Sequence, residues 1–396
     1  MDDREILVVG GGIGGITAAL CLAQRGFNVQ VFEQAAQIGE VGAGIQLSPN
    51  CSRVLHSLGL EAALRPIAFL PEGVEMRVWR SGKLISSSRL GATVREQFGA
   101  PYYHVHRADL MSVLLDAAQR ETHIQLHIGA RVDYATQKGG AVVLTVNGRE
   151  YTGAALVGAD GIRSVIRSTL FGEEAPTFTG SIAWRTLVPA NSLPKGLVRP
   201  MATAWWGPGK HFVHYYVRGG EWVNCVCVVE KQGWEVESWT ERGDHAELTR
   251  DFAGWHRDLQ VLIAAMNPQR CYKWALFDRA PMDRWSIGRM TLLGDACHPT
   301  LPFMAQGAAM AIEDAAVLAH CLAAGGRSGR DVPERLLAYE ALRRARTRRI
   351  QAGSRRNAKV FHLRGPAAWL RNRVARRAGE QMMDWLYSYN ALVEGM

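Results

Sequence analysis

The sequence lacks any run of about 18 apolar residues, which is the least that a membrane-spanning helix needs. It also lacks a basic segment at its start, where a secretory signal would carry one, because the first charged residues are Asp2 and Asp3. These two absences predict a cytoplasmic protein with no integral membrane segment.

Cysteine is sparse and its spacing suggests no cross-links. The seven cysteines form no CxxC pair, and their number is odd. This pattern favours neither a disulfide framework nor a zinc site, so we expect reduced core cysteines and no bound metal. Cys225 and Cys227 alternate in VNCVCVV, which predicts two small apolar side chains on one face of a buried strand.

Acidic residues are absent between Ala341 and Gly379, where thirteen Lys or Arg residues occur. The net charge of the whole chain is +9, so the rest of the chain is mildly acidic. No aromatic platform, zinc finger or recognition helix accompanies the basic segment, and we expect no nucleic-acid partner. We interpret the segment as a solvated helical face that could attract an anionic cofactor or a membrane surface.

The 396 residues exceed what one hydrophobic core holds, since single cores stop growing near roughly 250 to 300 residues. The start predicts a strand over 6–9, a glycine loop, a helix over 16–25 and a second strand over 27–32, which is nucleotide-binding topology. Alternating aromatic segments such as TAWWG and HFVHYYV, within 180–230, predict an inserted antiparallel sheet. The α/β pattern returns after about 285 with RMTLLGD, and helices follow.

A glycine pattern follows the first predicted strand. Gly10, Gly12 and Gly15 match GxGxxG: the first allows a tight turn, the second lets backbone approach a pyrophosphate, and the third lets the helix close on the strand. The next strand ends at Glu33, eighteen residues past Gly15, where a carboxylate can accept bonds from both ribose hydroxyls of an adenosine. Because Glu33 disfavours a 2′-phosphate, the pattern predicts tightly held FAD or NAD and not NADP.

A second set of motifs decides between FAD and NAD. GADGIRSVIR, residues 158–167, begins at the end of the strand-like segment AALVGAD, residues 154–160, and a turn capped by Asp160 would explain this motif alone. Arg107 in HRADL and the pair Gly294-Asp295 complete the set. With all three motifs in order, the chain resembles the group A FAD-dependent aromatic hydroxylases, which act on acids such as 3-hydroxybenzoate, salicylate and 6-hydroxynicotinate. The resemblance extends from Ile6 to about Asp384.

The resemblance implies FAD as the cofactor and assigns it a binding site. Within this site, Asp160, Gly161 and Arg167 are similar to a motif that contacts FAD and the nicotinamide co-substrate, and Asp295 to the carboxylate that binds the ribityl chain. The cofactor-binding residues that we predict are Gly10, Gly12, Gly15, Glu33, Gln46, Arg107, Asp160, Asp295, Gly307 and Ala308.

The stretch GDACHPTLPFMAQGAAMAIEDA, residues 294–315, fits this cofactor on physical grounds. A helix that starts near Gly307 presents free backbone N–H groups and the positive end of its dipole, which would stabilise a reduced, anionic flavin. Pro299 and Pro302 should stiffen the loop before it. We interpret His298 as a hydrogen-bonded loop residue, with a catalytic role as the alternative, and we expect the acidic pair at 313–314 to tie down neighbouring backbone.

In the family that the chain resembles, NADH or NADPH reduces FAD, and O2 then gives a C4a-hydroperoxyflavin that hydroxylates an electron-rich ring. The protein should help to deprotonate the substrate hydroxyl and should exclude water. HFVHYYVRGGEWVN is similar to a strand of 3-hydroxybenzoate 6-hydroxylases in which the residue matching His211 lies beside that hydroxyl. We predict His211 as the base or hydrogen-bond partner and Tyr215 as a residue of the pocket, with simple packing in a half-buried sheet as the alternative.

The predicted substrate is a small monocyclic hydroxy-aromatic acid of the 3-hydroxybenzoate or salicylate type. The alternatives are a 6-hydroxynicotinate-type substrate, or a flavin reductase or dehydrogenase of the same fold. Pro302, a predicted catalytic position, stands where 3-hydroxybenzoate 6-hydroxylases carry a glutamine. Gln46 and Phe303 stand where 6-hydroxynicotinate hydroxylases carry histidines. The partner of the substrate carboxylate stays open among Arg185, His104, His106 and Tyr103, and a homodimer also stays open.

The predicted fold class is α/β, with a Rossmann-like FAD-binding domain interleaved with an antiparallel β-sheet substrate domain, plus C-terminal helices. The FAD-binding domain should comprise 1–175 and 285–350, with strands near 70–100 joining the substrate domain. The substrate domain should comprise 176–284, and a helical segment 351–396.

Overall fold

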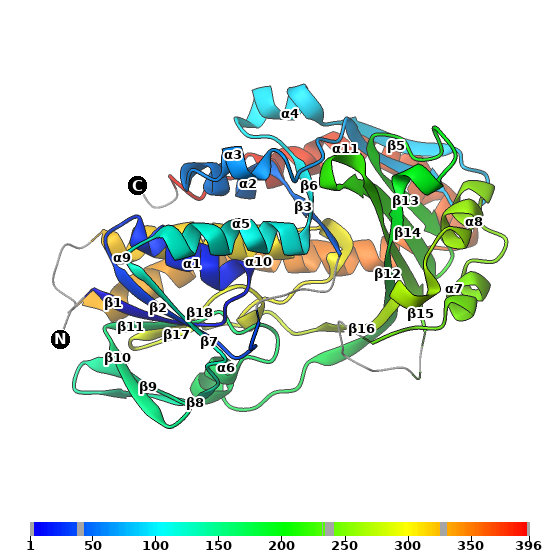
Figure 1. Cartoon of the computed structure of the whole chain (residues 1–396). Coiled ribbons are helices and arrows are strands. Elements are labelled where there is room, and N and C mark those ends of the chain that lie inside the picture. The colour runs from blue at the N-terminus through cyan, green and yellow to red at the C-terminus, as the bar shows by residue number, and fades with distance from the viewer. Residues whose placement is uncertain (1–3, 38–42, 232, 234–240, 325–330, 394–396) are drawn as a thin grey trace.

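The computed structural model of the chain describes residues 4–37, 43–231, 233, 241–324 and 331–393. Two main sheets lie at opposite sides of the molecule, a parallel one on the left of Figure 1 and a larger mixed one on the right. Helices cover the sheets and connect them, as expected for an α/β chain with an inserted sheet.

The parallel sheet has the strand order β17-β18-β11-β1-β2-β7. Its strands are β1 (Glu5–Val9), β2 (Asn28–Glu33), β7 (Ile124–Ile128), β11 (Ala155–Gly158), β17 (Ser286–Ile287) and β18 (Met290–Leu292). Neighbours pair in parallel except at the β17 edge. The apolar run of β1 is buried because both faces of the sheet are covered, one by helices and the other mainly by a small antiparallel sheet described below. The predicted order of strand, glycine loop, helix and strand at the start of the chain is confirmed.

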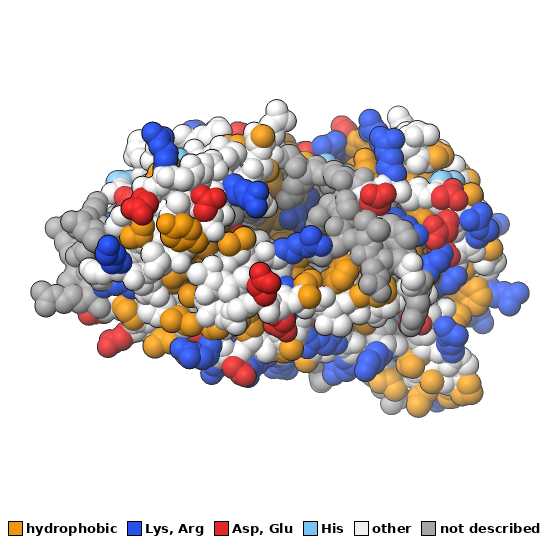
Figure 2. Space-filling view, turned by 90° about the horizontal axis from the view of Figure 1, so that it is seen from below, with side chains coloured by type: hydrophobic (Ala, Val, Ile, Leu, Met, Phe, Trp, Pro, Cys, Tyr) orange, Lys and Arg blue, Asp and Glu red, His pale blue; other side chains and the backbone are white. Residues whose placement is uncertain are grey.

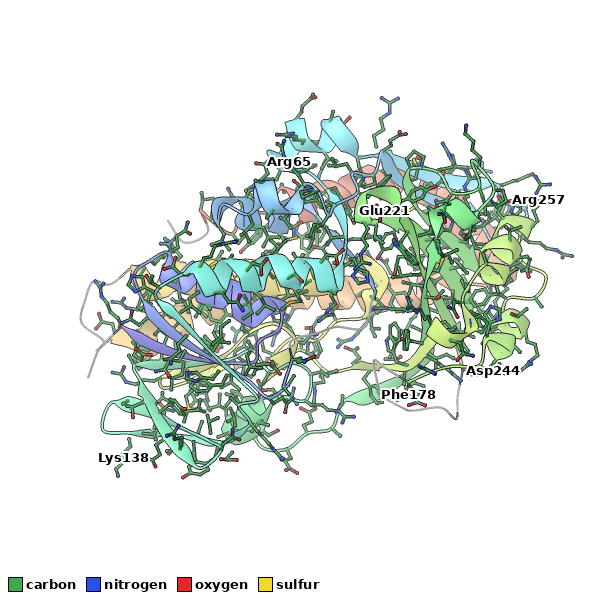
Figure 3. All side chains as sticks on the ribbon, viewed as in Figure 1. Arg65, Lys138, Phe178, Glu221, Asp244 and Arg257 are labelled. Carbon is green, nitrogen blue, oxygen red and sulfur yellow. The ribbon has the colours of Figure 1, made fainter. Side chains whose placement is uncertain are left out.

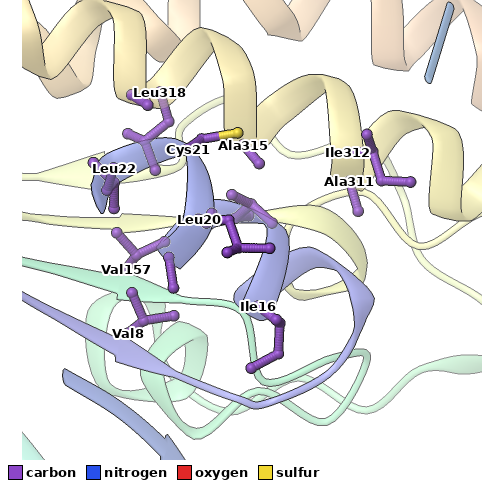
Figure 4. Packing of buried hydrophobic residues seen from close by; sticks show 14 of the residues in the cluster. Val8, Ile16, Leu20, Cys21, Leu22, Val157, Ala311, Ile312, Ala315 and Leu318 are labelled. Carbon is purple, nitrogen blue, oxygen red and sulfur yellow. The ribbon is translucent and has the colours of Figure 1, made fainter. Parts of the chain in front are cut away.

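The helix α1 (Ile13–Ala23) is apolar on all sides because it lies between this sheet and α9 (Gly307–Ala323) (Figure 4). The two helices approach closely at Gly14. A Cβ atom on Gly14 would lie 3.2 Å from the Cβ of Ala311 and 2.8 Å from Cδ2 of Leu293. The small residue at 14 therefore allows the contact that places the start of α9 beside the glycine loop.

The mixed sheet has the strand order β16-β12-β15-β14-β13-β4-β5. Its strands are β4 (Gly73–Val78), β5 (Leu84–Arg89), β12 (Thr177–Pro189), β13 (Met201–Gly207), β14 (Lys210–Val217), β15 (Trp222–Glu230) and β16 (Tyr272–Asp278). All neighbours pair antiparallel except β13 and β4, which pair in parallel. Figure 3 labels Phe178 and Glu221 at opposite ends of this sheet, as the antiparallel register of β12 and β15 requires.

One face of the mixed sheet packs against α7 (His245–Asp251) and α8 (Arg257–Ala264). Phe212, Cys225 and Cys227 lie in this core, so the predicted role of the two cysteines as buried strand residues is confirmed. The opposite face is left for the functional site described below.

The remaining elements are two small sheets and several helices. The sheets are β10-β9-β8, with β8 (Val132–Lys138), β9 (Ala141–Val146) and β10 (Arg149–Gly153), and β3-β6, with β3 (Gly44–Leu47) and β6 (Tyr103–His106). The helices are α2 (Pro49–Ser57), α3 (Glu61–Leu64), α4 (Gly91–Phe98), α5 (Arg107–Arg120), α6 (Val165–Phe171), α10 (Val332–Phe361) and α11 (Gly365–Tyr387). Within the described ranges, no helix combines the length and the apolar character that crossing a bilayer requires.

The basic segment occupies α10 and α11, but the predicted solvated face is wrong for three of its arginines. Arg343, Arg346 and Arg371 are buried, with at most 9% of each side chain exposed. Arg343 and Arg346 point inward because they form ion pairs with a buried acidic pair on α9, as described below. On the face shown in Figure 2, Lys and Arg side chains are interspersed with acidic and apolar ones and do not form one basic patch.

Candidate active site

Three glycines shape the loop between β1 and α1, for two different reasons. Gly10 has φ of 106°, and a Cβ there would lie 2.4 Å from the carbonyl oxygen of Ala159, while a Cβ on Gly15 would lie 1.9 Å from that of Gly10. Packing of the backbone therefore requires both glycines. A Cβ on Gly12 would meet nothing within 4 Å. This open side leads to the start of α1, whose first N–H groups have no side-chain cap, and such an arrangement suits a phosphate.

Glu33 ends β2 beside the same loop. Its Oε2 accepts a hydrogen bond from Gly11 N at 2.7 Å, and its Oε1 accepts one from Ala35 N at 2.8 Å. The two bonds hold the carboxylate next to the glycine loop. The contact with a ribose stays a prediction.

Asp160 caps the helix α6. Its carboxylate accepts hydrogen bonds from the backbone N–H groups of Val165 and Ile166, at 2.7 and 3.1 Å, and from the hydroxyl of Ser164 at 2.5 Å. Burial raises the pKa of Asp160, and these hydrogen bonds oppose that rise. The capping interpretation is thus confirmed, and a contact with cofactor stays a prediction.

Two adjacent cavities lie between the mixed sheet and the rest of the molecule. The inner cavity, of about 390 Å³, extends from the glycine loop to the mixed sheet. The outer cavity, of about 1170 Å³, lies between the mixed sheet and the C-terminal helices α10 and α11. The residues that line both cavities, and so mark their junction, are Gln46, His211, Val213, Pro302 and Ala305.

Most of the predicted site residues come together at the inner cavity. Those that line it are Gly12, Gln46, Arg107, His211, Tyr215, Asp295, Pro302, Gly307 and Ala308. Those that support its edge without lining it are Gly10, Gly15, Glu33 and Asp160.

The first turn of α9 faces the inner cavity through Gly307 and Ala308. The N-cap residue Gln306 provides no side-chain cap, so the first N–H groups and the positive end of the helix dipole stay available to a ligand. Instead, the Gln306 side chain bonds Ser48 at 3.0 Å and Asn50 at 3.1 Å, which fixes the start of α9 against α2.

Asp295 lines the inner cavity, so its side chain is accessible from the cavity although it lies deep inside the protein. Desolvation by the surrounding protein raises the pKa of Asp295, while the nearby His298 and Arg107 act to lower it. Burial lowers the pKa of Arg107, and Asp295 opposes that shift. The cavity thus holds an opposite pair of groups that could bind a polar, uncharged chain.

The strand β14 presents one face to the cavities. His211, Val213 and Tyr215 line the inner cavity, whereas Phe212 and Tyr216 pack on the other face, as the period of a strand predicts. Burial, and then proximity to His362, hold the pKa of His211 well below its ordinary value. A neutral imidazole at the junction of the cavities can accept a proton.

Arg185 lines the inner cavity, as Arg107 does. Of the four residues left open for a substrate carboxylate, it alone lines either cavity within the described chain. Its guanidinium carbon lies 4.1 Å from the ring centroid of Trp274, and burial lowers its pKa to about 9. His104 lies instead beside the Tyr215 ring, with 4.5 Å between centroids, and Tyr103 bonds His56.

Sequence reasoning missed three residues of the site. The Tyr102 hydroxyl donates to Gln46 Oε1 at 2.6 Å and so orients that side chain at the junction. His362 lies 2.8 Å from His211, and Trp274 lies under Arg185. A tyrosine within APYYHVH is a weak signal, and no local pattern could have paired His211 with a histidine 151 residues away.

The acidic pair on α9 forms a buried ionic cluster behind the site. Asp314 accepts bonds from Gly294 N at 3.1 Å and from His298 Nε2 at 2.6 Å, so its predicted bond to backbone and the predicted hydrogen-bonded state of His298 are confirmed. Glu313 differs from expectation, because the partners of its carboxylate are the side chains of Arg343, Arg346 and Asn50. Arg343 also reaches Asp314, through Nε at 2.7 Å. The cluster ties the 294–298 loop to α10.

The described residues contain no group of three His, Cys, Asp or Glu side chains that could hold a metal ion. All seven cysteines are buried and free, at Cys21, Cys51, Cys225, Cys227, Cys271, Cys297 and Cys321.

Comparisons with known proteins agree with this geometry. The sequence profile of the FAD binding domain family matches residues 3–354. The 3-hydroxybenzoate 6-hydroxylase of Polaromonas naphthalenivorans is 38% identical over 394 residues, which cover 98% of this chain and 96% of the relative. The 3-amino-4-hydroxybenzoate 2-monooxygenase PtnB3 of Streptomyces platensis is 39% identical over 394 residues, covering 99% and 97%. The structure of Klebsiella pneumoniae HpxO with FAD and uric acid has a TM-score of 0.85 at 28% identity, covering 99% and 97%.

Proposed function

The chain belongs to the FAD binding domain family, and we propose that it is a monooxygenase that hydroxylates a monocyclic hydroxy-aromatic acid of the 3-hydroxybenzoate or salicylate type. It is a flavoprotein of the aromatic hydroxylase class, with FAD as cofactor. In the proposal, NADH or NADPH is the reductant and O2 is the oxidant. The proposal keeps the two domains within the limits predicted above, and it keeps the predicted roles of the site residues.

The residues around the inner cavity fit FAD. Gly12 leaves open space at the uncapped start of α1, where a pyrophosphate can accept backbone bonds. Asp295 and Arg107 offer one acceptor and one donor to a polyhydroxyl chain, and the start of α9 at Gly307 offers a positive dipole end to the negative edge of a flavin. Bound FAD would supply the transfer of electrons from the nicotinamide and of one oxygen atom from O2 to the substrate.

The chain's own residues would bind and activate the aromatic acid at the junction of the two cavities. His211 would accept the proton of the substrate hydroxyl, because a phenolate ring is far more electron-rich than a phenol. Tyr215 keeps its proton, since burial raises its pKa, and can donate to the substrate from the same face of β14. Pro302 and Val213 would close the site against water.

Arg185 would bind the substrate carboxylate. It lines the same cavity as His211 and comes from β12, two strands away across the sheet. A guanidinium over the Trp274 ring is held in a fixed orientation, which suits a planar carboxylate. This pairing favours an acid over a neutral phenol as substrate.

One observation carries the proposal: a neutral histidine and an arginine share a cavity with an uncapped helix start and an open glycine loop. The test is to purify the protein, record its flavin spectrum and measure NADH oxidation and O2 consumption with candidate acids. We would use 3-hydroxybenzoate, salicylate, 4-hydroxybenzoate, 3-amino-4-hydroxybenzoate and 6-hydroxynicotinate, with identification of each product. If no benzoate stimulates oxidation, the proposed substrate class is wrong.

The same assay separates the alternatives. Hydroxylation of 6-hydroxynicotinate alone would identify the chain as an N-heterocycle hydroxylase. NADH oxidation without hydroxylated product would indicate a reductase or dehydrogenase of the same fold.

We extend the proposal to a homodimer. Trp369, Leu370 and Val374 on α11 are more than half exposed, which is unusual for large apolar side chains that lie close together. Light scattering of the purified protein measures the assembly, and a monomeric mass would contradict this part of the proposal.

A further inference from the structure

Three side chains connect the junction of the cavities to the surface. His211 Nδ1 lies 2.8 Å from His362 Nε2, and His362 Nδ1 lies 2.9 Å from Glu230 Oε1. Both histidines are buried, with 4% and 5% exposed, whereas 47% of the Glu230 side chain is exposed. The three come from β14, from the end of α10 and from the end of β15. Only the folded chain brings them together.

The carboxylate at the surface fixes the tautomer of both histidines. Ionised Glu230 can only accept a hydrogen bond, so His362 Nδ1 must carry the proton. Neutral His362 then has a bare Nε2, which can only accept, so His211 must donate from Nδ1. Neutral His211 is therefore left with a bare Nε2, the nitrogen that is free to take a proton from a ligand in the cavity.

The groups packed around these three side chains keep both histidines neutral. Phe303 and Phe361 pack against the His211 ring, with centroids 5.0 and 5.5 Å away. Burial lowers the pKa of His362, the hydrogen bond that His362 donates to Glu230 opposes this shift, and the positive Arg371 and Arg364 lower the pKa further. Arg364 lies 3.7 Å from Glu230, so the carboxylate has a positive neighbour at the surface. The row of three hydrogen-bonded side chains thus starts in an apolar site at His211 and ends at a solvated, charged site at Glu230.

We propose that His362 and Glu230 form a proton relay, which holds His211 in the accepting tautomer and passes the substrate's hydroxyl proton to solvent. This inference rests on the proposed role of His211. The substrate O–H bond breaks as the His211 Nε2–H bond forms. His211 Nδ1–H then breaks as His362 Nε2–H forms, and His362 Nδ1–H breaks as a Glu230 O–H forms. Glu230 returns the proton to water, so charge and atoms balance and no electron moves.

The test follows the proton itself, in holoenzyme without NADH. Stopped-flow mixing with 3-hydroxy-4-nitrobenzoate, whose phenolate is yellow, is read together with a pH indicator in weakly buffered solution. We expect wild type to form bound phenolate and to release one proton. In His362→Ala and Glu230→Gln, release should slow by about tenfold or more, while the probe's Kd stays within about threefold.

Imidazole should restore release in His362→Ala, which a merely structural role would not produce, and should not do so in Glu230→Gln. The control is His214→Gln, a buried histidine on the other face of β14 that bonds Trp205 at 3.0 Å. Its release rate should match wild type. Glu230→Gln changes a half-exposed residue at a strand end, so it keeps the test valid if His362→Ala does not fold.

Wild-type release rates in both variants would overturn the relay. The relay would also be overturned if wild type binds the probe with no proton release while an aromatic acid stimulates NADH oxidation, and the proposed function would then stand. Slow, imidazole-rescued release with no stimulating acid would support the relay and contradict the proposed function.

Discussion

Arg346 and Glu313 form a buried, two-pronged ion pair. Arg346 Nε lies 2.8 Å from Glu313 Oε2, and Arg346 Nη2 lies 2.7 Å from Glu313 Oε1, with less than a tenth of either side chain exposed. Arg343 reaches the same carboxylate at 2.6 Å. One acidic residue of α9 therefore pairs with two arginines of α10, and Asp314 supplies the second negative charge through Arg343. The helix that carries the cavity-facing Gly307 is thus fixed to α10.

The first prediction concerns this pair. Glu313→Gln would leave the buried Arg346 without a carboxylate and Arg343 with Asp314 alone, and we expect the free energy of unfolding to fall by roughly 3 to 5 kcal/mol. Chemical denaturation measures the change. The matched control is Glu334→Gln, an exposed residue in the first turn of α10, which should change it by less than about 0.5 kcal/mol. Equal effects of the two substitutions would show that the cluster adds no stability.

The second prediction concerns acid. Burial acts to raise the pKa of Glu313, but Arg343, Arg346 and Asn50 hold it below its ordinary value of 4.5. A carboxyl whose pKa is lower in the folded state stabilises fully above its unfolded pKa and loses that contribution as pH falls through the folded pKa. The difference in unfolding free energy between wild type and Glu313→Gln should therefore be constant above about pH 5 and should shrink below pH 4.5. A difference that grows on acidification would contradict this.

The buried ionic cluster also shows which features of the fold could not be predicted from the sequence. The glycine loop, the strand carrying His211 and the helix after Gly307 could be predicted, because each is a local pattern of period and turn residues. The inward direction of Arg343 and Arg346 could not, since α10 is basic throughout and nothing local distinguishes buried arginines from solvated ones. Their direction depends on the acidic pair of another helix.

The proposed relay shows, at the site itself, that contacts between distant segments could not be predicted from the sequence. The resemblance predicted that His211 faces a ligand, and strand alternation only places Tyr215 on the same face of β14. The partners of His211 could not be predicted, because His362 ends a helix and Glu230 ends another strand. Arg185 could only be kept as one of four candidates until the structure placed it in the cavity.

The third prediction separates cofactor binding from folding. Gly12→Ala adds a methyl group to open space at the cavity, so the apoprotein should keep its melting temperature while FAD affinity falls by about tenfold or more. Gly15→Ala should destabilise the apoprotein itself, because its Cβ would overlap the Gly10 carbonyl. Flavin fluorescence and thermal melts measure the two effects. Unchanged FAD affinity in Gly12→Ala would place the pyrophosphate elsewhere.

The fourth prediction assigns the substrate carboxylate. Arg185→Gln should raise KM for the stimulating acid about 10-fold to 100-fold, because a hydrogen bond to a charged group is worth roughly 1.5 to 3 kcal/mol. The KM for the matching phenol without a carboxylate should change little. Equal increases for the acid and the phenol would show that Arg185 supports the cavity and does not bind the carboxylate. Steady-state NADH oxidation measures both constants.

The fifth prediction concerns His211. Loss of a general base costs roughly 10²-fold to 10⁴-fold in rate, so His211→Ala should slow product formation by an amount in that range. FAD content should match wild type, because the glycine loop and the start of α9 are untouched. Hydroxylated product per NADH consumed should also fall, since reduction by the nicotinamide does not need the substrate phenolate. His214→Gln, on the opposite face of the same strand, should retain wild-type product formation. If both substitutions slow the reaction equally, the effect comes from the strand, and the base must be sought elsewhere in the inner cavity.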